Sequence, residues 1–280
     1  MVFMTKKAIA LITLVLLAGL LCTAGCTNEQ QAITATGDNA TPAGTDTSLF
    51  VYSGAGLKKP MTAIGEAFTG KYGIGVEYTF AGSGTLITQM DLSRKGDAFI
   101  PGGTPDYRIA QEKGLVGEPG YVAYHVPVIA VQKGNPQNIT SVDDFARPGL
   151  KIALGGVNTT AIGRAGDKLF EKHGIRDAVE KNVVLRAPTI NEVVVAMNMG
   201  TADAALLTLD QINPETMDTI DLPPENGLVL IVPVGATTFT EHPDAARQFV
   251  EFVTSDEGKA IFAKHGFPTY PDPAYAGIEP

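Results

Sequence analysis

Four short segments of this 280-residue chain bring small residues together with hydroxyl or amide side chains. The segments are Ser53-Gly54-Ala55, Ser83-Gly84-Thr85, Asn158-Thr159-Thr160-Ala161 and Thr189-Ile190-Asn191. Each follows a run of strand-forming residues and stands where the spacing of apolar residues becomes helical. The N-terminus of a helix offers backbone N–H groups without helical acceptors, together with a partial positive charge. Hydroxyl groups add further donors, so the four segments predict a site that holds a small anion.

A simpler interpretation of each segment is that it only caps a helix. Ser, Thr and Asn are preferred N-cap residues in any protein, and for one segment alone this interpretation is the better one. The four segments occupy matching positions in the predicted elements, which favours a shared site. Arg164 lies one turn after Thr160, and Arg186 precedes Pro188, just before the fourth segment. Such arginines usually pair with nearby acids, and otherwise they would reach a larger acid ligand.

The motifs of several enzyme classes are absent. The chain has no G-x-x-x-x-G-K-[ST] motif, and neither Ser53 nor Ser83 lies in a G-x-S-x-G nucleophile elbow. Its four histidines include no i,i+4 pair that could bind a metal ion on a helix. We therefore predict that the protein is not an enzyme, and that it has neither a cofactor nor side chains that bind a metal cation. A secreted serine hydrolase that uses Ser53 or Ser83 is an alternative, but it requires a His and a carboxylate beside that Ser.

Composition excludes two further classes. The chain has 21 Lys+Arg against 30 Asp+Glu, a net charge of −9. Because nucleic-acid binding needs basic residues to neutralise phosphates, nucleic acid is not expected as a partner. A hydrophobic content of 44% excludes disorder of the whole chain. Both cysteines lie in the first 26 residues, so the folded part has no disulfide framework.

The elements that must position the four segments alternate between strand and helix. Residues 49–52, 76–80, 98–100, 151–154 and 204–207 read as strands. Helical spacing follows, as in Leu57, Met61, Ile64 and Phe68, and two helices close the chain at 242–253 and 255–264. Such alternation predicts an α/β fold with mainly parallel sheets that helices cover on both faces. The loops at the carboxyl ends of parallel strands are where ligands bind.

Two extended segments, 121–131 and 228–234, each contain a proline, Pro127 and Pro233. Proline cannot donate to a sheet, so such a strand should lie at an edge or change sheets at that point. We therefore predict two lobes joined by two crossings, with lobe 1 at 48–124 plus 235–280 and lobe 2 at 125–234. The alternative is a single sheet with edge strands.

The N-terminus predicts export and a lipid anchor. Lys6 and Lys7 precede the apolar run 8–21, which has the length of a signal peptide and is short for a membrane span. Thr23-Ala24-Gly25-Cys26 resembles a lipobox, so residues 1–25 are the predicted signal peptide and Cys26 the lipid carrier. Residues 26–47 are then a polar, flexible tether. The alternatives are an ordinary secreted protein and an uncleaved anchor.

Three stretches of the sequence resemble a known family. VYSGAGLKKPMTAIGEAF, YTFAGSGTLITQM and DAARQFVEFVTSDEGKAIFAKHGF are similar to segments of the molybdate/tungstate-binding proteins of ABC importers. The resemblance implies a two-lobed type II periplasmic-binding-protein fold that encloses a tetrahedral oxyanion with hydroxyl and amide groups. It places the binding serines on Ser53 and Ser83, amide donors at Thr160, Ala161 and Asn191, and a hydroxyl on Thr208.

The resemblance also implies a function, an extracytoplasmic, membrane-anchored lipoprotein that captures molybdate or tungstate and passes it to ABC permease subunits. Thr208 is shorter than the Tyr common in the family, and Pro101-Gly102 replaces the usual small polar residues. The first difference counts against molybdate, and the second would widen the pocket for tungstate, a phosphorylated acid or a carboxylate. A receptor for sulfate, a phosphate ester or a small organic acid is therefore an alternative. A surface adhesin is a further alternative and predicts no closed cleft.

Overall fold

The computed structural model describes residues 47–223 and 228–280. The predicted signal peptide, Cys26 and almost all of the predicted tether therefore lie outside the described residues. Within those two ranges, no helix is long and apolar enough to cross a membrane.

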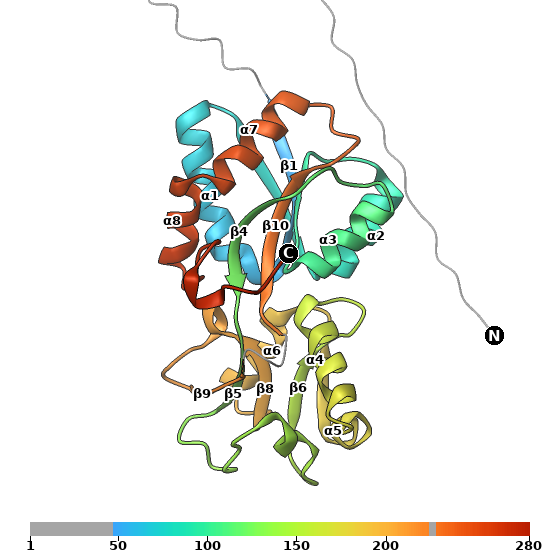
Figure 1. Ribbon diagram of the computed structural model, residues 1–280, viewed down its shortest axis with the longest axis vertical. Helices are drawn as coiled ribbons and strands as arrows, with labels where there is room; N and C mark the ends of the chain where they lie inside the picture. The colour runs from blue at the N-terminus through green and yellow to red at the C-terminus, as the bar shows by residue number, and fades with distance from the viewer. Residues whose placement is uncertain (1–46, 224–227) are drawn as a thin grey trace, which may run out of the picture. The chain divides into compact units, whose positions relative to one another are not determined.

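The first lobe is built on a five-stranded sheet with the order β2-β1-β3-β10-β4. Its strands are β1 Ser48–Gly54, β2 Gly75–Ala81, β3 Ala98–Ile100, β4 Gly120–His125 and β10 Leu230–Ala236. β1 pairs in parallel with β2 and β3, whereas β10 runs antiparallel to β3 and β4. Two groups of helices lie on either side of this sheet (Figure 1).

One group consists of α1 (Lys58–Tyr72), α7 (Pro243–Thr254) and α8 (Asp256–Lys264), and the other of α2 (Ser83–Ser93) and α3 (Thr104–Glu112). The short 3₁₀ helix η1 (Ala55–Leu57) leads directly into α1. The apolar positions of α1 are fully buried, and the ring of Phe68 lies 5.2 Å from that of Phe249 on α7. Ser255 caps α8 by accepting a hydrogen bond from the Gly258 amide. Helical spacing and capping thus produce the elements that the sequence predicts here.

The second lobe has a sheet with the order β7-β6-β8-β5-β9. Its strands are β5 Pro127–Gln132, β6 Ile152–Gly155, β7 Val183–Ala187, β8 Ala204–Thr208 and β9 Met217–Asp221. Its helices are α4 Ala161–Lys172, α5 Arg176–Asn182 and α6 Ile190–Asn198, with 3₁₀ turns η2 Val142–Ala146 and η3 Leu209–Gln211. β6 is parallel to β7 and β8, and β5 is antiparallel to β8 and β9.

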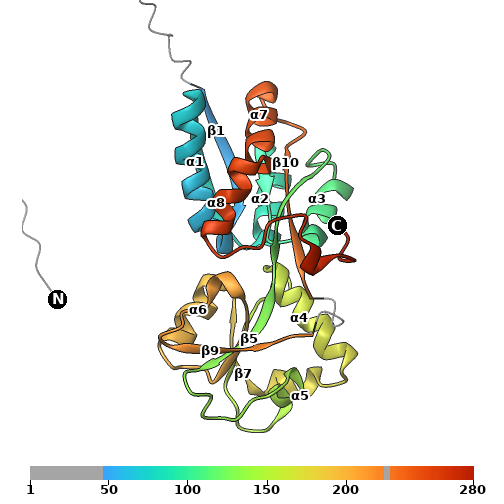
Figure 2. The same ribbon diagram turned by 60° about the vertical axis from the view of Figure 1, so that its left-hand side comes forward.

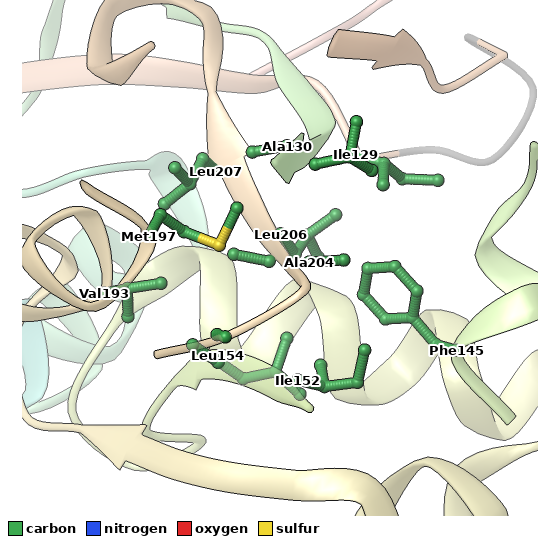
Figure 3. Packing of buried hydrophobic residues seen from close by; sticks show 14 of the residues in the cluster. Ile129, Ala130, Phe145, Ile152, Leu154, Val193, Met197, Ala204, Leu206 and Leu207 are labelled. Carbon is green, nitrogen blue, oxygen red and sulfur yellow. The ribbon is translucent and has the colours of Figure 1, made fainter. Parts of the chain in front are cut away.

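The core of the second lobe lies on both faces of its sheet, because successive residues of a strand point to opposite faces. On β8, Leu207 lies beside Met197 of α6 (Figure 3). Its neighbour Leu206 comes so close to Gly166 of α4 that a Cβ on that glycine would meet Leu206 Cδ2 at 2.6 Å. The helices α4 and α6, whose N-terminal ends carry two of the predicted segments, thus cover opposite faces of one sheet.

The two-lobed α/β fold with two crossings is confirmed, and the crossings are visible where the chain runs between the sheets (Figure 2). The first crossing is at Val126, between β4 and β5, and the second lies between β9 and β10. Because β10 pairs with β3 and β4 over its whole length, Leu230–Val234 and His125 belong to the first sheet. The boundaries between the lobes, predicted at 124/125 and 234/235, therefore move to Val126 and to the start of β10. Each sheet is mixed, since β5 and β10 run antiparallel to their neighbours.

Pro233 does not lie at an edge, contrary to the simplest expectation. It stands in the middle of β10, where the register with β4 shifts between Val232 and Pro233. The shift leaves Val122 of β4 without a partner, whereas Pro233 itself is opposite Tyr121. Such irregularities are among the few places where a sheet tolerates a proline inside a strand. Pro127, in contrast, is the first residue of β5, directly after the chain has changed sheets.

Candidate functional site

A cavity of about 50 Å³ lies between the lobes, at the carboxyl ends of β1, β2, β6 and β8. Six of the ten predicted binding residues line it: Gly54, Ala55, Ser83, Thr160, Ala161 and Thr208. Among the described residues that line it, none is Lys, Arg, Asp or Glu. The wall is therefore made of backbone, hydroxyl groups and apolar side chains, with one histidine.

Ser83 is held with its hydroxyl proton free. It is the first helical residue of α2, and it is almost completely buried. Its Oγ accepts a hydrogen bond of 3.1 Å from the backbone amide of Gly102, which also lines the cavity. A hydroxyl that accepts one hydrogen bond still has its own proton to donate. Ser83 can therefore donate that proton to a group in the cavity.

Thr160 is used differently. It is the N-cap of α4, and its Oγ1 accepts a hydrogen bond of 3.0 Å from the Gly163 amide. The same hydroxyl donates to the carbonyl oxygen of Gly156 at 3.1 Å. Its proton is thus committed within the loop, and Thr160 acts as a cap. The amides of Ala161 and Ile162, which precede Gly163 and line the cavity, have no acceptor within the helix and are the donors that α4 offers.

Four predicted residues do not line the cavity: Ser53, Gly84, Thr85 and Asn191. Ser53 is fully buried, and its hydroxyl makes only a long contact of 3.4 Å to the Gly54 carbonyl. The amide of Gly84 donates to the Thr159 carbonyl at 3.1 Å, and Asn191 Nδ2 donates to the Ala55 carbonyl at 3.1 Å. Both hydrogen bonds join one lobe to the other. Gly84 and the Asn191 side chain therefore hold the lobes together.

Two glycines allow the lobes to approach closely. A Cβ on Gly82 would collide with the carbonyl oxygens of Thr159 and Pro188, and one on Gly84 would collide with that of Asn158. Because these carbonyls belong to the second lobe, any larger residue at 82 or 84 would keep the lobes apart. Gln211 Nε2 adds a further hydrogen bond of 3.1 Å across the cleft, to the Gly56 carbonyl.

His125 lines the cavity although it is not among the ten predicted binding residues. Its Nδ1 donates to the Gly102 carbonyl at 2.7 Å, and its ring packs on Phe267 with centroids 5.0 Å apart. Its Nε2 lies 3.9 Å from Asp210 Oδ1. Gly102 thus receives a hydrogen bond from His125 and gives one to Ser83, so His125 helps to fix the direction of the Ser83 hydroxyl. The position of His125 at the end of β4, next to the crossing, is the one sequence signal that could have indicated this.

The two arginines near the segments pair with acids, as expected. Arg164 Nη2 lies 2.5 Å from Oδ1 of Asp106, which joins α4 to α3 across the cleft. Asp106 is fully buried, and burial raises the pKa of its carboxyl, although the adjacent guanidinium works against the shift. Arg186 pairs with Glu180 at 2.6 Å. Neither arginine lines the cavity, so a ligand there is bound by neutral donors.

The described residues offer no Ser–His pair of the kind that a hydrolase needs. His125 Nδ1 is directed at the Gly102 carbonyl, and Ser83 Oγ is bonded to the Gly102 amide. The fully buried Ser53 makes its one side-chain contact with the Gly54 carbonyl. Nor do three or more His, Cys, Asp or Glu side chains gather as metal ligands anywhere in residues 47–223 and 228–280.

Comparison with known proteins identifies the family of this chain. Residues 49–268 match the model of the family described as bacterial extracellular solute-binding protein. The molybdate-binding protein ModA of Mycobacterium tuberculosis is 31% identical over 224 residues, which are 79% of this chain and 84% of that protein.

Two solved structures share the fold. The sulfate-binding protein SubI of Mycobacterium tuberculosis superposes with a TM-score of 0.69 at 20% identity, over 82% of this chain and 89% of its own. The periplasmic molybdate-binding protein of Azotobacter vinelandii gives a TM-score of 0.66 at 16% identity, over 78% of this chain and 98% of its own. The chain therefore belongs to the bacterial extracellular solute-binding proteins, within the type II periplasmic-binding-protein superfamily.

Proposed function

We propose that this protein captures a small tetrahedral oxyanion, molybdate or tungstate in the first place, and delivers it to the permease of an ABC importer. The observation that carries the proposal is the cavity, where the free proton of Ser83 and the amides of Ala161 and Ile162 converge from two lobes. The mycobacterial relative is named as a molybdate-binding protein, which supports the choice of ligand.

The size of the cavity favours a compact ligand. A cavity of about 50 Å³ is small, which suits a ligand of a few atoms. A tetrahedral oxyanion has four oxygen atoms around a small centre. A phosphate ester and a larger organic acid are bulkier, and we rank both behind the inorganic anions.

The donors suit a fully enclosed anion. A hydrogen bond to a charged group contributes about 1.5–3 kcal/mol, and a micromolar Kd requires about −8 kcal/mol, so several such donors must act together. Ser83 and Thr208 supply hydroxyl groups, and the starts of α2, α4 and α6 supply amides. Helix N-termini add a positive potential without the desolvation cost of a buried Lys or Arg. Closure of the two lobes around the ligand is then the binding mechanism.

Sulfate is the second candidate, because a sulfate-binding protein has the same fold. Sulfate and molybdate have the same charge and shape, but molybdate is larger. Isothermal titration with molybdate, tungstate, sulfate, inorganic phosphate and a small carboxylate would rank them. We expect molybdate and tungstate to bind at least about tenfold more tightly than sulfate, a difference of about 1.4 kcal/mol. Tighter binding of the carboxylate than of any oxyanion would overturn the proposal.

Export and lipid attachment at Cys26 complete the proposed function, and both rest on the sequence. Mass spectrometry of the membrane-bound protein should find a lipid-modified N-terminal Cys26 and no residues 1–25. A Cys26→Ser variant should be released from the membrane fraction, whereas a Cys22→Ser variant should stay attached. Retention of the Cys26→Ser variant would favour an uncleaved anchor.

A further inference from the structure

Helix α4 carries a row of three basic residues, Arg164, Lys168 and Lys172. They are four residues apart, which places them on one face of the helix, with about 6 Å of rise between neighbours. All three line a second hollow, of about 200 Å³, together with Pro105 and Leu230 of the first lobe. The basic face of α4 is therefore directed into the cleft between the lobes.

The second hollow adjoins the cavity. Ala161 and Leu230 line both of them. Ala161 is also the first residue of α4, so the same helix presents its amides to the cavity and its basic face to the adjoining hollow. An anion in the second hollow would be one helix turn or more from the amide donors.

The charges on and around α4 leave two lysines uncommitted in this hollow. Arg164 is paired with the buried Asp106 of α3. Asp167 of α4 lies on another face and is paired with Arg176 at 2.9 Å. Among the residues that the structure describes, no carboxylate forms an ion pair with Lys168 or Lys172.

The negative net charge of the chain makes a local positive charge useful for anion binding. A protein with a charge of −9 repels an approaching anion, whereas a basic patch beside the site raises the local anion concentration and the association rate. We propose that Lys168 and Lys172 form an outer anion site in the second hollow, which holds a small divalent oxyanion before it enters the cavity. This inference rests on the proposed function. It states that the two lysines contact the anion when it first meets the protein, and that they do not contact it in the closed complex.

Association and dissociation rates of molybdate, measured by stopped-flow Tyr fluorescence, test the outer site. For a Lys168→Gln/Lys172→Gln variant we expect about tenfold slower association at about 0.01 M ionic strength, where charges act over about 30 Å. At about 1 M salt, where that range is about 3 Å, the difference should shrink to less than about twofold. Dissociation should be unchanged in both conditions.

The matched control is Lys151→Gln/Lys181→Gln. Both residues are exposed, lie in the second lobe and line neither hollow, and the change in net charge is the same. This control should associate at nearly the parent rate. If association slows equally in both variants, the effect comes from net charge alone. If molybdate dissociates faster from the Lys168/Lys172 variant, the lysines contact the ligand in the closed complex. Either result would overturn the proposal.

A second measurement does not depend on the cavity. In a low-salt titration of the parent protein with inorganic phosphate, the side-chain NMR signals of Lys168 and Lys172 should shift at millimolar concentration. Those of Lys151 and Lys181 should move much less. If molybdate fails to bind but these shifts occur, the proposed ligand is wrong and the outer site stands. If molybdate binds and no shift occurs, the outer site is wrong.

Discussion

The two lobes both bring a hydroxyl-bearing residue to the start of a helix, but they use it in different ways. Ser83 of the first lobe follows the N-cap Gly82, and its hydroxyl accepts from Gly102 and keeps its proton free. Thr160 of the second lobe is itself the N-cap, and its hydroxyl both accepts and donates within its own loop. A shift of one residue along the helix start thus separates a hydroxyl that is free to donate from a structural cap.

The comparison assumes that the helix starts of both lobes contact one ligand at the same time. Gly84→Ala tests this assumption, because it should keep the lobes apart. Its Cβ would collide with the Asn158 carbonyl and prevent closure, so molybdate should bind about 100-fold more weakly, or about 2.7 kcal/mol. Isothermal titration measures this. Gly70→Ala is the control, because a Cβ there meets nothing within 4 Å. Unchanged affinity of the Gly84 variant would show that the ligand needs one lobe only.

Ser83→Ala tests the free donor. Loss of one hydrogen bond to a charged ligand should weaken binding by about 1.5–3 kcal/mol, which is about 10- to 100-fold. The free energy of unfolding without ligand should fall by about 0.5–1.5 kcal/mol, because the Gly102 amide loses its acceptor. Ser48→Ala, at the exposed start of β1, is the matched control and should leave affinity unchanged. Equal affinity of the Ser83 variant and the parent would remove Ser83 from the site.

Thr160→Ala should act mainly on stability and less on affinity for the ligand. Loss of the cap should lower the free energy of unfolding by about 1 kcal/mol, because the Gly163 amide loses its acceptor. Affinity should fall less than in the Ser83 variant, since the Ala161 and Ile162 amides remain. Urea denaturation and titration measure the two effects, and Thr160→Ser should restore stability. A loss of affinity as large as that of Ser83→Ala would mean that the Thr160 hydroxyl reaches the ligand.

The start of η2 has a capping side chain but does not line the cavity, so it shows the effect of a cap without a ligand. Asp144 of η2 accepts from the Thr140 amide at 2.7 Å, and this hydrogen bond, with further help from Thr140 and Ser141, lowers the pKa of its carboxyl. A lowered pKa stabilises the fold above the unfolded value of about 3.9, and this contribution disappears as the pH falls through the lower folded value.

Asp144→Asn should therefore lower the free energy of unfolding at pH 7 by up to about 1 kcal/mol. The difference from the parent should vanish in strong acid, well below pH 3.9, the reference value for Asp. Urea denaturation at the two pH values measures it, with molybdate affinity as the internal control. A pH-independent difference would mean that the Asp144 charge is not what stabilises this turn.

The sequence was sufficient for the architecture because its signals are local. Strand-to-helix alternation placed β1, α2 and α4, and the position of the segments after strands placed six predicted residues around one cavity. The crossings were also predicted, although Pro233 lies in an interior strand. The local rule for proline does not reveal a bulge, which depends on the partner strand β4.

The sequence could not show which donors are free, because that depends on contacts between distant residues. Gly102 is 19 residues from Ser83 and 23 from His125, yet its amide bonds to the first and its carbonyl oxygen to the second. The commitment of Gly84 and Asn191 to contacts across the cleft likewise exists only after the lobes close. Motif spacing found the helix starts, and only three-dimensional structure distinguishes their roles.

The main-chain donors at Ala161 and Ile162 have a consequence for how this pocket can change over generations. An amide proton is present in every encoded amino acid except proline, so a codon change that alters the side chain leaves the donor in place. Substitutions around this pocket can therefore alter its width and lining while the backbone amide donors persist. Only proline at these positions would delete a donor, and at residue 161 the first turn of α4 would accept that ring without breaking.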